Sequence, residues 1–256
     1  MGAKRASRKT RQNFSNVVQL HNFNKKSIVN ILPRNRNQES YMLKLLDREK
    51  DIVFGIGPAG TGKTMLAVQT AIKMFKESIV DKIIITRPAV SADEDLGFLP
   101  GTLEQKMAPW TRPIFDVIRE YYNAREIESM IEESIIEIAP LAYMRGRTFK
   151  NSFILADEMQ NATPNQMKML LTRLGENSKM AVTGDLAQAD RLKDNGLIDF
   201  VKQLKQSNVD RLDIVEFYHE DIERHQAVKE VLEVYGDEER KGLIPLSTVP
   251  LKETLL

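Results

Sequence analysis

A glycine-rich stretch in the first quarter of the chain has the residue types that hold a nucleotide phosphate. Residues 57–64 read Gly-Pro-Ala-Gly-Thr-Gly-Lys-Thr and match the pattern G-x-x-x-x-G-K-[ST]. Glycines let successive backbone N–H groups turn inward around a phosphate, and the N-terminus of a following helix adds its positive dipole end. We therefore expect nucleotide binding at this stretch, called the P-loop below: Gly57, Pro58, Ala59, Gly60, Thr61, Gly62, Lys63 and Thr64.

Two residues of the P-loop carry separate chemical roles. The lysine of this pattern reaches the outer phosphates, and the hydroxyl of the last residue ligates Mg²⁺. We expect Lys63 to serve catalysis as well as binding, and Thr64 to be a metal ligand. The apolar runs 52–54 and 65–68 give the P-loop the strand and helix that the motif requires. A glycine-rich turn that binds nothing is the alternative.

A pair of acids, Asp157 and Glu158, follows the apolar run 153–156. An aspartate at the end of such a strand holds Mg²⁺, and an adjacent glutamate can orient and deprotonate an attacking water. We expect Asp157 to be the second metal residue and Glu158 the general base; a solvated surface pair is the alternative. Glu158 argues against the small GTPases, and it disfavours a small-molecule kinase because it suits water as the acceptor.

A third polar strand end reads Thr183-Gly184-Asp185, with Gln188 three residues further on. In phosphate-loop proteins with a catalytic glutamate, an extra strand lies between the two strands that carry the P-loop and the acids. A polar residue at its tip can sense the γ-phosphate. We assign that role to Gln188, and an ordinary loop glutamine is the alternative.

The elements around these residues alternate between short apolar strands and helices. We predict strands at 52–56, 82–86, 135–138, 153–156, 180–183 and 212–217, with helices beginning near 37, 63, 163, 196 and 222. Such alternation indicates an α/β fold with a parallel sheet and helices on both faces. We divide the chain into a basic tail and irregular lead-in at 1–34, one domain at 35–236, and a C-terminal tail at 237–256.

The alternation is interrupted by a helical insertion at 91–134, which we interpret as a lid or a surface for a partner. Thr102 and Gln105 form a capping-box pattern that opens a helix. Pro109 and Pro113 are expected to break or kink it, and a charged helix is expected at 116–133. The last helix, from Ile222 onward, has an amphipathic spacing that predicts a core-facing side.

Composition excludes several other classes of protein. The 256 residues are 42% hydrophobic and 29% charged, enough for a globular core. We expect no membrane span, because no apolar run approaches about 18 residues. We expect no signal peptide, because no apolar segment lies near the N-terminus. The chain has no cysteine, which suits a cytoplasmic location.

The basic residues are unevenly distributed, although the net charge is only +1. Five of them lie within residues 1–12, where there is no acid: Lys4, Arg5, Arg8, Lys9 and Arg11. This segment is either a solubilising tail or a basic arm that binds nucleic acid phosphates.

Several longer segments closely resemble the PhoH-like proteins, a phosphate-starvation-inducible ATPase family related to superfamily 1 helicases. In order with the P-loop, they read T-R-P-A-V (86–90), L-G-F-L-P-G (96–101), K-M-A-P-W (106–110), R-G-R-T-F-K-N (145–151), D-E-M-Q-N (157–161) and T-G-D-L-A-Q (183–188). The segment 221–228 is similar to the family's R-H-x-x-V, with Gln226 where a proline is more usual, and Asp93 stands where a glycine is typical. The resemblance covers about 35–236.

The resemblance implies that one RecA-like P-loop NTPase domain binds and hydrolyses ATP with Mg²⁺. Gln38 would read the adenine, Gln188 would sense the γ-phosphate, and Arg224 would stabilise the transferring phosphate charge. Arg87, Arg145 and Arg147 match segments near the nucleic acid path of related helicases, with a solvated surface role as the alternative for each arginine.

We consider two functions. The first is a helicase-like ATPase that acts on RNA or single-stranded DNA. Because one RecA-like domain is half of a superfamily 1 motor, we expect a homo-oligomer, either a ring such as a hexamer or a filament. In it a neighbour's Arg224 enters the site, with Arg191 as second choice. The alternative is an ATP-dependent assembly or regulatory switch that binds a protein partner without unwinding. We expect no PIN nuclease domain, because the segment before residue 35 is too short.

Overall fold

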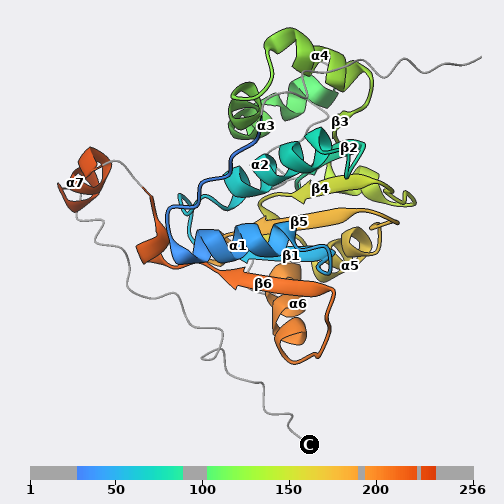
Figure 1. Ribbon diagram of the computed structural model, residues 1–256. Coiled ribbons are helices and arrows are strands. Elements are labelled where there is room, and N and C mark those ends of the chain that lie inside the picture. The colour runs from blue at the N-terminus through green and yellow to red at the C-terminus, as the bar shows by residue number, and fades with distance from the viewer. Residues whose placement is uncertain (1–27, 89–102, 190–193, 224–225, 235–256) are drawn as a thin grey trace, which may run out of the picture.

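Six apolar runs form one parallel sheet in the computed structural model, which describes residues 28–88, 103–189, 194–223 and 226–234 (Figure 1). The strand order is β3-β2-β4-β5-β1-β6. The strands are β1 (Ile52–Ile56), β2 (Lys82–Thr86), β3 (Ile136–Ile138), β4 (Ser152–Ala156), β5 (Lys179–Gly184) and β6 (Leu212–Glu216).

Helices cover both faces of the sheet, as the alternation predicts. They are α1 (Arg36–Leu46), α2 (Lys63–Lys76), α3 (Leu103–Arg119), α4 (Ala124–Glu132), α5 (Pro164–Leu171), α6 (Gly196–Lys205) and α7 (Gln226–Val234). Helices α1 to α4 share one apolar core with the sheet, and α5 and α6 share the other. Every residue of β1, β4 and β5 is buried, because these central strands are covered on both sides. The α/β fold with a parallel sheet is confirmed.

The strand order brings the three polar strand ends together at the carboxyl end of the sheet. Strand β5 lies between β4 and β1, with Ala156 opposite Val182 and Ile56 opposite Gly184. All three strands are parallel, so the residues that follow them emerge side by side at their carboxyl ends. This arrangement places the P-loop, the acids after β4 and the tip of β5 next to one another.

The helical insertion differs from the sequence prediction in two places. Helix α3 continues through Pro109 and Pro113, so the predicted break is absent, and the alternative of a kink stays a prediction. Buried residues further along α3, Ile114 and Ile118, pack against the core and supply stability that local propensity lacks. The charged segment 116–133 is two helices, because Asn123 caps α4 through a bond from the Glu126 N–H at 3.0 Å. Thr102 lies outside the described residues.

The prediction that the last helix packs on the core is wrong for its described residues. Helix α7 begins at Gln226, after the short 3₁₀ turn η4 (His219–Asp221). Val228 and Val231 are 44% and 51% exposed. These two valines therefore follow a helical spacing without being buried in the described fold.

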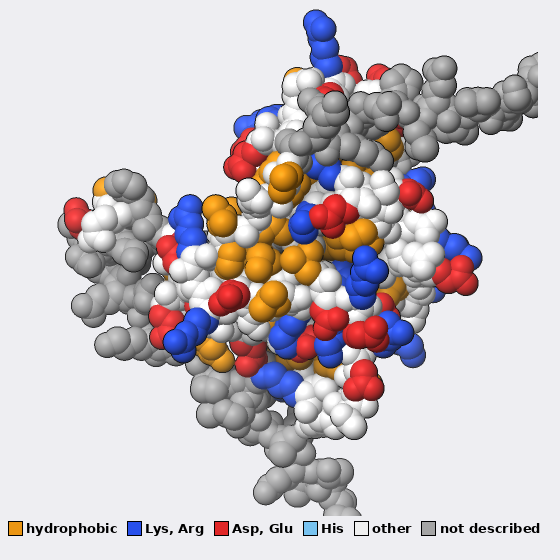
Figure 2. Space-filling view, viewed as in Figure 1, with side chains coloured by type: hydrophobic (Ala, Val, Ile, Leu, Met, Phe, Trp, Pro, Cys, Tyr) orange, Lys and Arg blue, Asp and Glu red, His pale blue; other side chains and the backbone are white. Residues whose placement is uncertain are grey.

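Some apolar surface also remains on the main body. Figure 2 shows hydrophobic side chains gathered over α1 and α2 within a rim of charges. Leu43 of α1 is 57% exposed, and Leu32, in the segment before α1, is 76% exposed. In the described part of the chain, no helix has the length and apolar composition needed to cross a membrane.

The buried Lys179 ties β5 to the end of α1 and gives a first prediction. Its Nζ donates to the Asp47 carbonyl at 2.5 Å, and burial lowers the pKa of its amine to about 8. Because the unfolded chain binds this proton more tightly, the contribution of Lys179 to stability rises between pH 8 and pH 10.5. Relative to a Lys179→Met variant, the wild-type free energy of unfolding should increase by about 2 kcal/mol across that window. Urea denaturation of both proteins at several pH values measures this; parallel pH profiles would contradict it.

Candidate nucleotide site

The P-loop joins the end of β1 to the start of α2, and its glycines allow its shape. Gly62 has φ +83°, so the chain turns directly into α2 and presents the first N–H groups of the helix toward the loop. A Cβ at Gly57 would lie 2.2 Å from the Phe217 carbonyl oxygen, so that position requires glycine. The loop is thereby held against the segment that follows β6.

Lys63 folds back over the P-loop. Its Nζ donates to the carbonyls of Gly57 and Pro58 at 2.7 Å and 2.6 Å, and to Thr61 Oγ1 at 3.1 Å. Burial lowers the pKa of the Lys63 amine, and the carboxylates of Asp185 and the acids after β4 act in the opposite direction. The ammonium group therefore lies where it can exchange carbonyl contacts for phosphate oxygens.

Oxygen ligands suited to Mg²⁺ meet between α2 and β4. Thr64 Oγ1 donates to Asp157 Oδ1 at 2.7 Å, and Thr183 Oγ1 donates to the same oxygen. Mg²⁺ prefers oxygen ligands, keeps several waters and needs only one or two protein groups beside phosphate. Among the described residues no cluster of three or more His, Cys, Asp or Glu could hold a metal. The pair of Thr64 and Asp157 fits this shared mode of binding.

Glu158 occupies an unusual backbone conformation at the turn after β4. Its φ is +54°, in the left-handed region that non-glycine residues seldom adopt. Such conformations concentrate at functional sites. Its carboxylate is half-buried, and its Oε2 accepts a bond from Gln160 Nε2 at 2.5 Å. Gln160 was not among the residues predicted to act at the site, although it lies three residues after Asp157.

The tip of β5 contacts the P-loop through Asp185 rather than through Gln188. Asp185 Oδ2 accepts from the Ala59 N–H at 3.1 Å, and its Oδ1 accepts from the Ala187 N–H at 3.0 Å. Gln188 ends the 3₁₀ turn η3 (Leu186–Gln188), and its side chain is exposed. The role of Gln188 as a sensor of the γ-phosphate remains a prediction. Asp185 is a further functional candidate: the sequence placed it at the polar end of the strand but assigned it no role of its own.

Gln38 lies in α1 beneath the P-loop, with only 1% of its surface exposed. Its Nε2 donates to the Thr61 carbonyl at 3.0 Å, and its Oε1 accepts from the Arg34 N–H at 2.8 Å. Both ends of the amide are thus bonded within the chain, and one bond positions the P-loop. Its predicted role in reading adenine remains a prediction.

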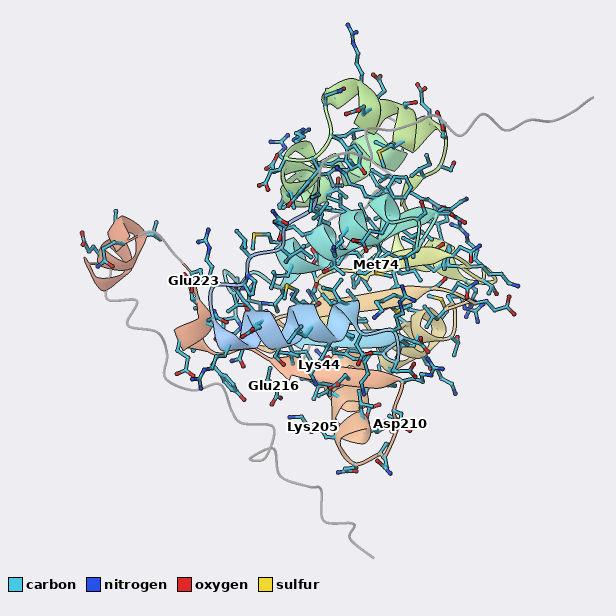
Figure 3. The ribbon with its side chains drawn as sticks, viewed as in Figure 1. Lys44, Met74, Lys205, Asp210, Glu216 and Glu223 are labelled. Carbon is cyan, nitrogen blue, oxygen red and sulfur yellow. The ribbon has the colours of Figure 1, made fainter. Side chains whose placement is uncertain are left out.

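The segment after β6 is also bonded to the P-loop. The Glu223 N–H donates to the Gly60 carbonyl at 3.1 Å, and Asn37 Nδ2 donates to Asp221 Oδ2 at 2.7 Å. Figure 3 labels Glu223 on this segment, close to the first turn of α1. Arg224, the predicted charge-stabilising arginine, lies outside the described residues.

Most of the chain matches the model of one known protein family. That family is described as "PhoH-like protein", and its model matches residues 30–236. The chain belongs to the PhoH-like protein family. It is 49% identical over 190 residues to a PhoH-like protein of Bacillus subtilis, covering 73% of this chain and 59% of that protein. It is 42% identical over 210 residues to Protein PhoH of Escherichia coli K12, covering 80% and 58% of the two chains.

This PhoH-like chain thus spans about 60% of the length of these relatives. Among solved structures, it resembles the Pif1 helicase from Candida albicans with 14% identity and a TM-score of 0.38, over 80% of this chain and 44% of that one. A likeness this low adds nothing to the family assignment.

The three arginines predicted to contact nucleic acid differ in their surroundings. Arg145 is exposed, and Arg87 is half-buried at the end of β2. The guanidinium of Arg147 pairs with both carboxylate oxygens of Glu137 and lies 4.5 Å from the centre of the Phe149 ring. This bidentate pair lowers the pKa of Glu137. Within this PhoH family member, Arg147 is therefore already engaged, and Arg145 is the better placed to contact a phosphate.

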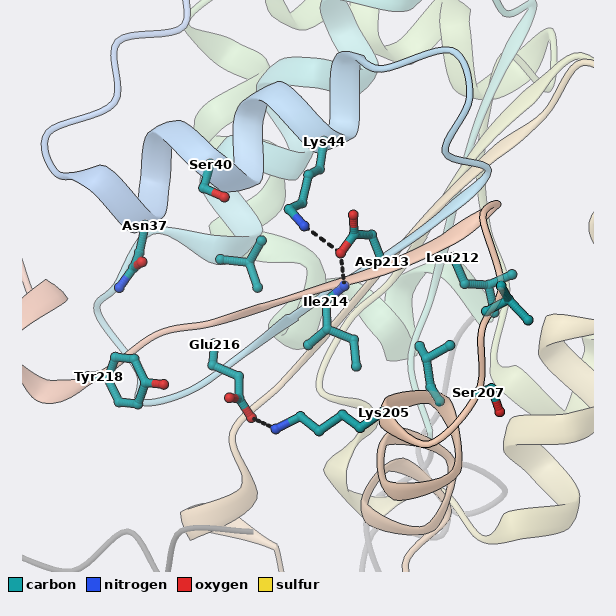
Figure 4. A pocket seen from close by; sticks show the side chains of 13 residues that line it. Asn37, Ser40, Lys44, Lys205, Ser207, Leu212, Asp213, Ile214, Glu216 and Tyr218 are labelled. Atoms are coloured by element: carbon teal, nitrogen blue, oxygen red, sulfur yellow. Dashed lines mark hydrogen bonds and ion pairs between the residues drawn. The ribbon is translucent and has the colours of Figure 1, made fainter. Parts of the chain in front are cut away.

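A groove of about 510 Å³ lies elsewhere, between α1, β6 and α6. Figure 4 shows its two ion pairs, Lys44 with Asp213 and Lys205 with Glu216. Asp213 also accepts from the Ile214 N–H at 2.8 Å, which caps a backbone donor of the outermost strand. The groove follows the edge of the sheet beyond β6 and contains none of the P-loop residues.

Proposed function

We propose that this chain binds ATP with Mg²⁺ and hydrolyses it as an oligomeric, helicase-like ATPase acting on RNA or single-stranded DNA. One observation carries the ATPase part. Thr64 and Asp157 are bonded at 2.7 Å between the P-loop helix and β4, directly before Glu158. The residues to which we assign phosphate binding, metal binding and general-base catalysis thereby lie together at one end of the strands.

The described residues divide the reaction between them. The N–H groups of the P-loop and Lys63 bind the phosphates, and Thr64 and Asp157 hold Mg²⁺. The metal, when bound, neutralises phosphate charge. Glu158 orients a water and removes its proton, and we assign the γ-phosphate contact to Gln188.

The nucleic acid part rests on the family and on the distribution of basic residues. Arg145 is exposed on the segment before β4, and the basic residues of 1–12 add a second group of cations. A single RecA-like domain cannot step along a strand alone. We therefore propose that several copies assemble, as a ring such as a hexamer.

The rate of ATP hydrolysis with and without a single-stranded oligonucleotide tests this function. We expect single-stranded RNA or DNA to raise the rate several-fold, and blunt duplex DNA of equal nucleotide content to serve as the matched control. A rate of hydrolysis that neither polymer changes would favour the alternative function, an ATP-dependent switch that binds a protein partner. Absence of hydrolysis under all conditions would refute the ATPase itself.

Replacing the general base should separate binding from turnover. Glu158→Gln should slow hydrolysis by about 100-fold or more, because one general base is lost, and should leave ATP affinity unchanged. Titration with ATP and a single-turnover assay measure the two quantities. If affinity falls as far as the rate, Glu158 acts as a metal ligand or a structural residue instead.

Removing the basic tail tests the nucleic acid contact. Deleting residues 1–12 should reduce the steepness of the slope of log affinity against log salt concentration by up to about 3.5. Each of the five basic residues can make one phosphate contact, and each contact contributes about 0.7 to this slope on single strands. A full-length variant with Lys4, Arg5, Arg8, Lys9 and Arg11 changed to Gln is the matched control and should behave in the same way. An unchanged slope would leave the tail as a solubilising segment.

A further inference from the structure

A chain of hydrogen bonds runs from the P-loop to the carboxylate of Glu158. The Ala59 N–H donates to Asp185 Oδ2 at 3.1 Å, and the Asp185 N–H donates to Gln160 Oε1 at 3.1 Å. Gln160 Nε2 in turn donates to Glu158 Oε2 at 2.5 Å. Two residues outside the assigned machinery, Asp185 and Gln160, thus connect phosphate binding to the general base.

The orientation of Gln160 is fixed by its neighbours. Its side chain is only 3% exposed, and its backbone carbonyl accepts from Asn195 Nδ2. One end of the amide faces a main-chain N–H and must accept, and the other end faces a carboxylate and must donate. Glutamine satisfies both contacts, whereas a glutamate of the same size satisfies only the first.

Asp185 is bonded to a backbone donor of the P-loop. The inward-facing N–H groups of a P-loop are the ligands of the phosphate oxygens. The Ala59 N–H of the same loop is bonded to the Asp185 carboxylate, which also accepts from the Ala187 N–H. A phosphate oxygen and a carboxylate oxygen cannot accept the same proton in one place, and their negative charges repel. A phosphate that takes the Ala59 N–H would therefore displace Asp185.

We propose that Gln160 is a positioning residue that sets the orientation of Glu158 according to whether phosphate or Asp185 occupies the Ala59 N–H. The main-chain and side-chain bonds of Asp185 belong to one residue, so a displacement from the P-loop that includes its backbone moves the partner of Gln160 as well. Gln160 then transmits this movement to the Glu158 carboxylate. This inference rests on the proposed hydrolysis of ATP and adds regulation of the same site.

The decisive experiment is a double-mutant cycle between Gln160 and Glu158. Gln160→Met removes both amide bonds at similar volume and should lower kcat about 10- to 100-fold, with KM changed less than about twofold, because only the alignment of the base is lost. In the Glu158→Gln background, the same substitution should change kcat less than about twofold. Gln160→Glu, which keeps the bond to Asp185 but not the donor toward Glu158, should behave like Gln160→Met.

A second arm tests displacement at the P-loop. Asp185→Asn keeps an acceptor for the Ala59 N–H but removes the charge that competes with phosphate, so it should bind ATP several-fold more tightly than wild type. Titration with ATP in the Glu158→Gln background measures this without hydrolysis. Unchanged or weaker binding would overturn the placeholder role of Asp185.

The outcomes separate this inference from the function on which it rests. If Gln160→Met lowers kcat equally in both backgrounds, or raises KM in step, Gln160 does not act through Glu158. Wild-type protein that binds ATP without hydrolysing it would refute the proposed function and the inference together. Thermal melting confirms folding of each variant, and if Gln160→Met does not fold, Gln160→Glu carries the same comparison.

Discussion

Lys63→Ala should reduce kcat/KM for ATP by about 10³-fold or more, because a charge-assisted phosphate contact and stabilisation of the transition state are lost together. In the structure the Lys63 ammonium already makes three bonds within the P-loop, to Gly57, Pro58 and Thr61. No other described lysine has this position. The effect should therefore appear in nucleotide affinity as well as in turnover.

A matched lysine on the same helix provides the control. Lys73 pairs with Glu77 at 2.5 Å on the outer side of α2, away from the P-loop. Lys73→Ala should leave ATP hydrolysis unchanged. Steady-state kinetics and ATP titration of both variants, with melting curves to confirm folding, complete the comparison. Near wild-type turnover in folded Lys63→Ala protein would contradict the interpretation of residues 57–64 as a phosphate-binding loop.

The fold was largely predictable because its signals are local. Each central strand is a short apolar run, and α5 begins at Thr163, whose capping box with Gln166 forms in both directions. Parallel strands then bring their carboxyl ends together, so the P-loop, Asp157 and the tip of β5 converge without further information. The predicted meeting of Thr64 and Asp157 follows from this rule alone.

The parts that were not predicted depend on distant partners. Gln160 bonds to Asp185, 25 residues away, and Asp185 bonds to Ala59, 126 residues away. Neither contact has a local pattern, because a glutamine or aspartate in a loop is ordinary by itself. The predicted break in α3 was wrong for a related reason. Burial of Ile114 and Ile118 stabilises the helix more than the two prolines destabilise it. In α7 the helical spacing is present, but its described apolar residues are exposed.

Arg224→Ala should lower kcat by about 10³-fold, because an arginine that reaches the γ-phosphate stabilises the charge that develops in hydrolysis. ATP affinity should fall much less, since this charge belongs to the transition state. The preceding residue, Glu223, is exposed, and its described contact with the P-loop is made by the backbone. Glu223→Ala is therefore the neighbouring control and should retain near wild-type turnover. Steady-state kinetics and ATP titration of both variants measure the two effects.

Whether Arg224 acts on the nucleotide site of its own chain or on that of a neighbouring subunit is a separate question. A ring would allow Arg224 to act on the neighbouring subunit, as expected from the sequence for a single RecA-like domain. The backbone of Glu223, however, is bonded to Gly60 of its own P-loop at 3.1 Å. This bond concerns Glu223, and Arg224 itself lies outside the described residues, so action on a neighbouring subunit stays a prediction.

Mixing two inactive proteins decides between the two arrangements. Lys63→Ala subunits retain Arg224, and Arg224→Ala subunits retain an intact P-loop, so a mixed assembly contains a complete site only if the arginine crosses between subunits. Because one RecA-like domain is expected to receive this arginine from a neighbour, we expect hydrolysis to recover in the mixture. Light scattering and capture of one differently tagged subunit by the other must confirm that mixed assemblies form. A mixture as inactive as its parts, with mixed assemblies confirmed, would show that Arg224 acts within one chain or not at all.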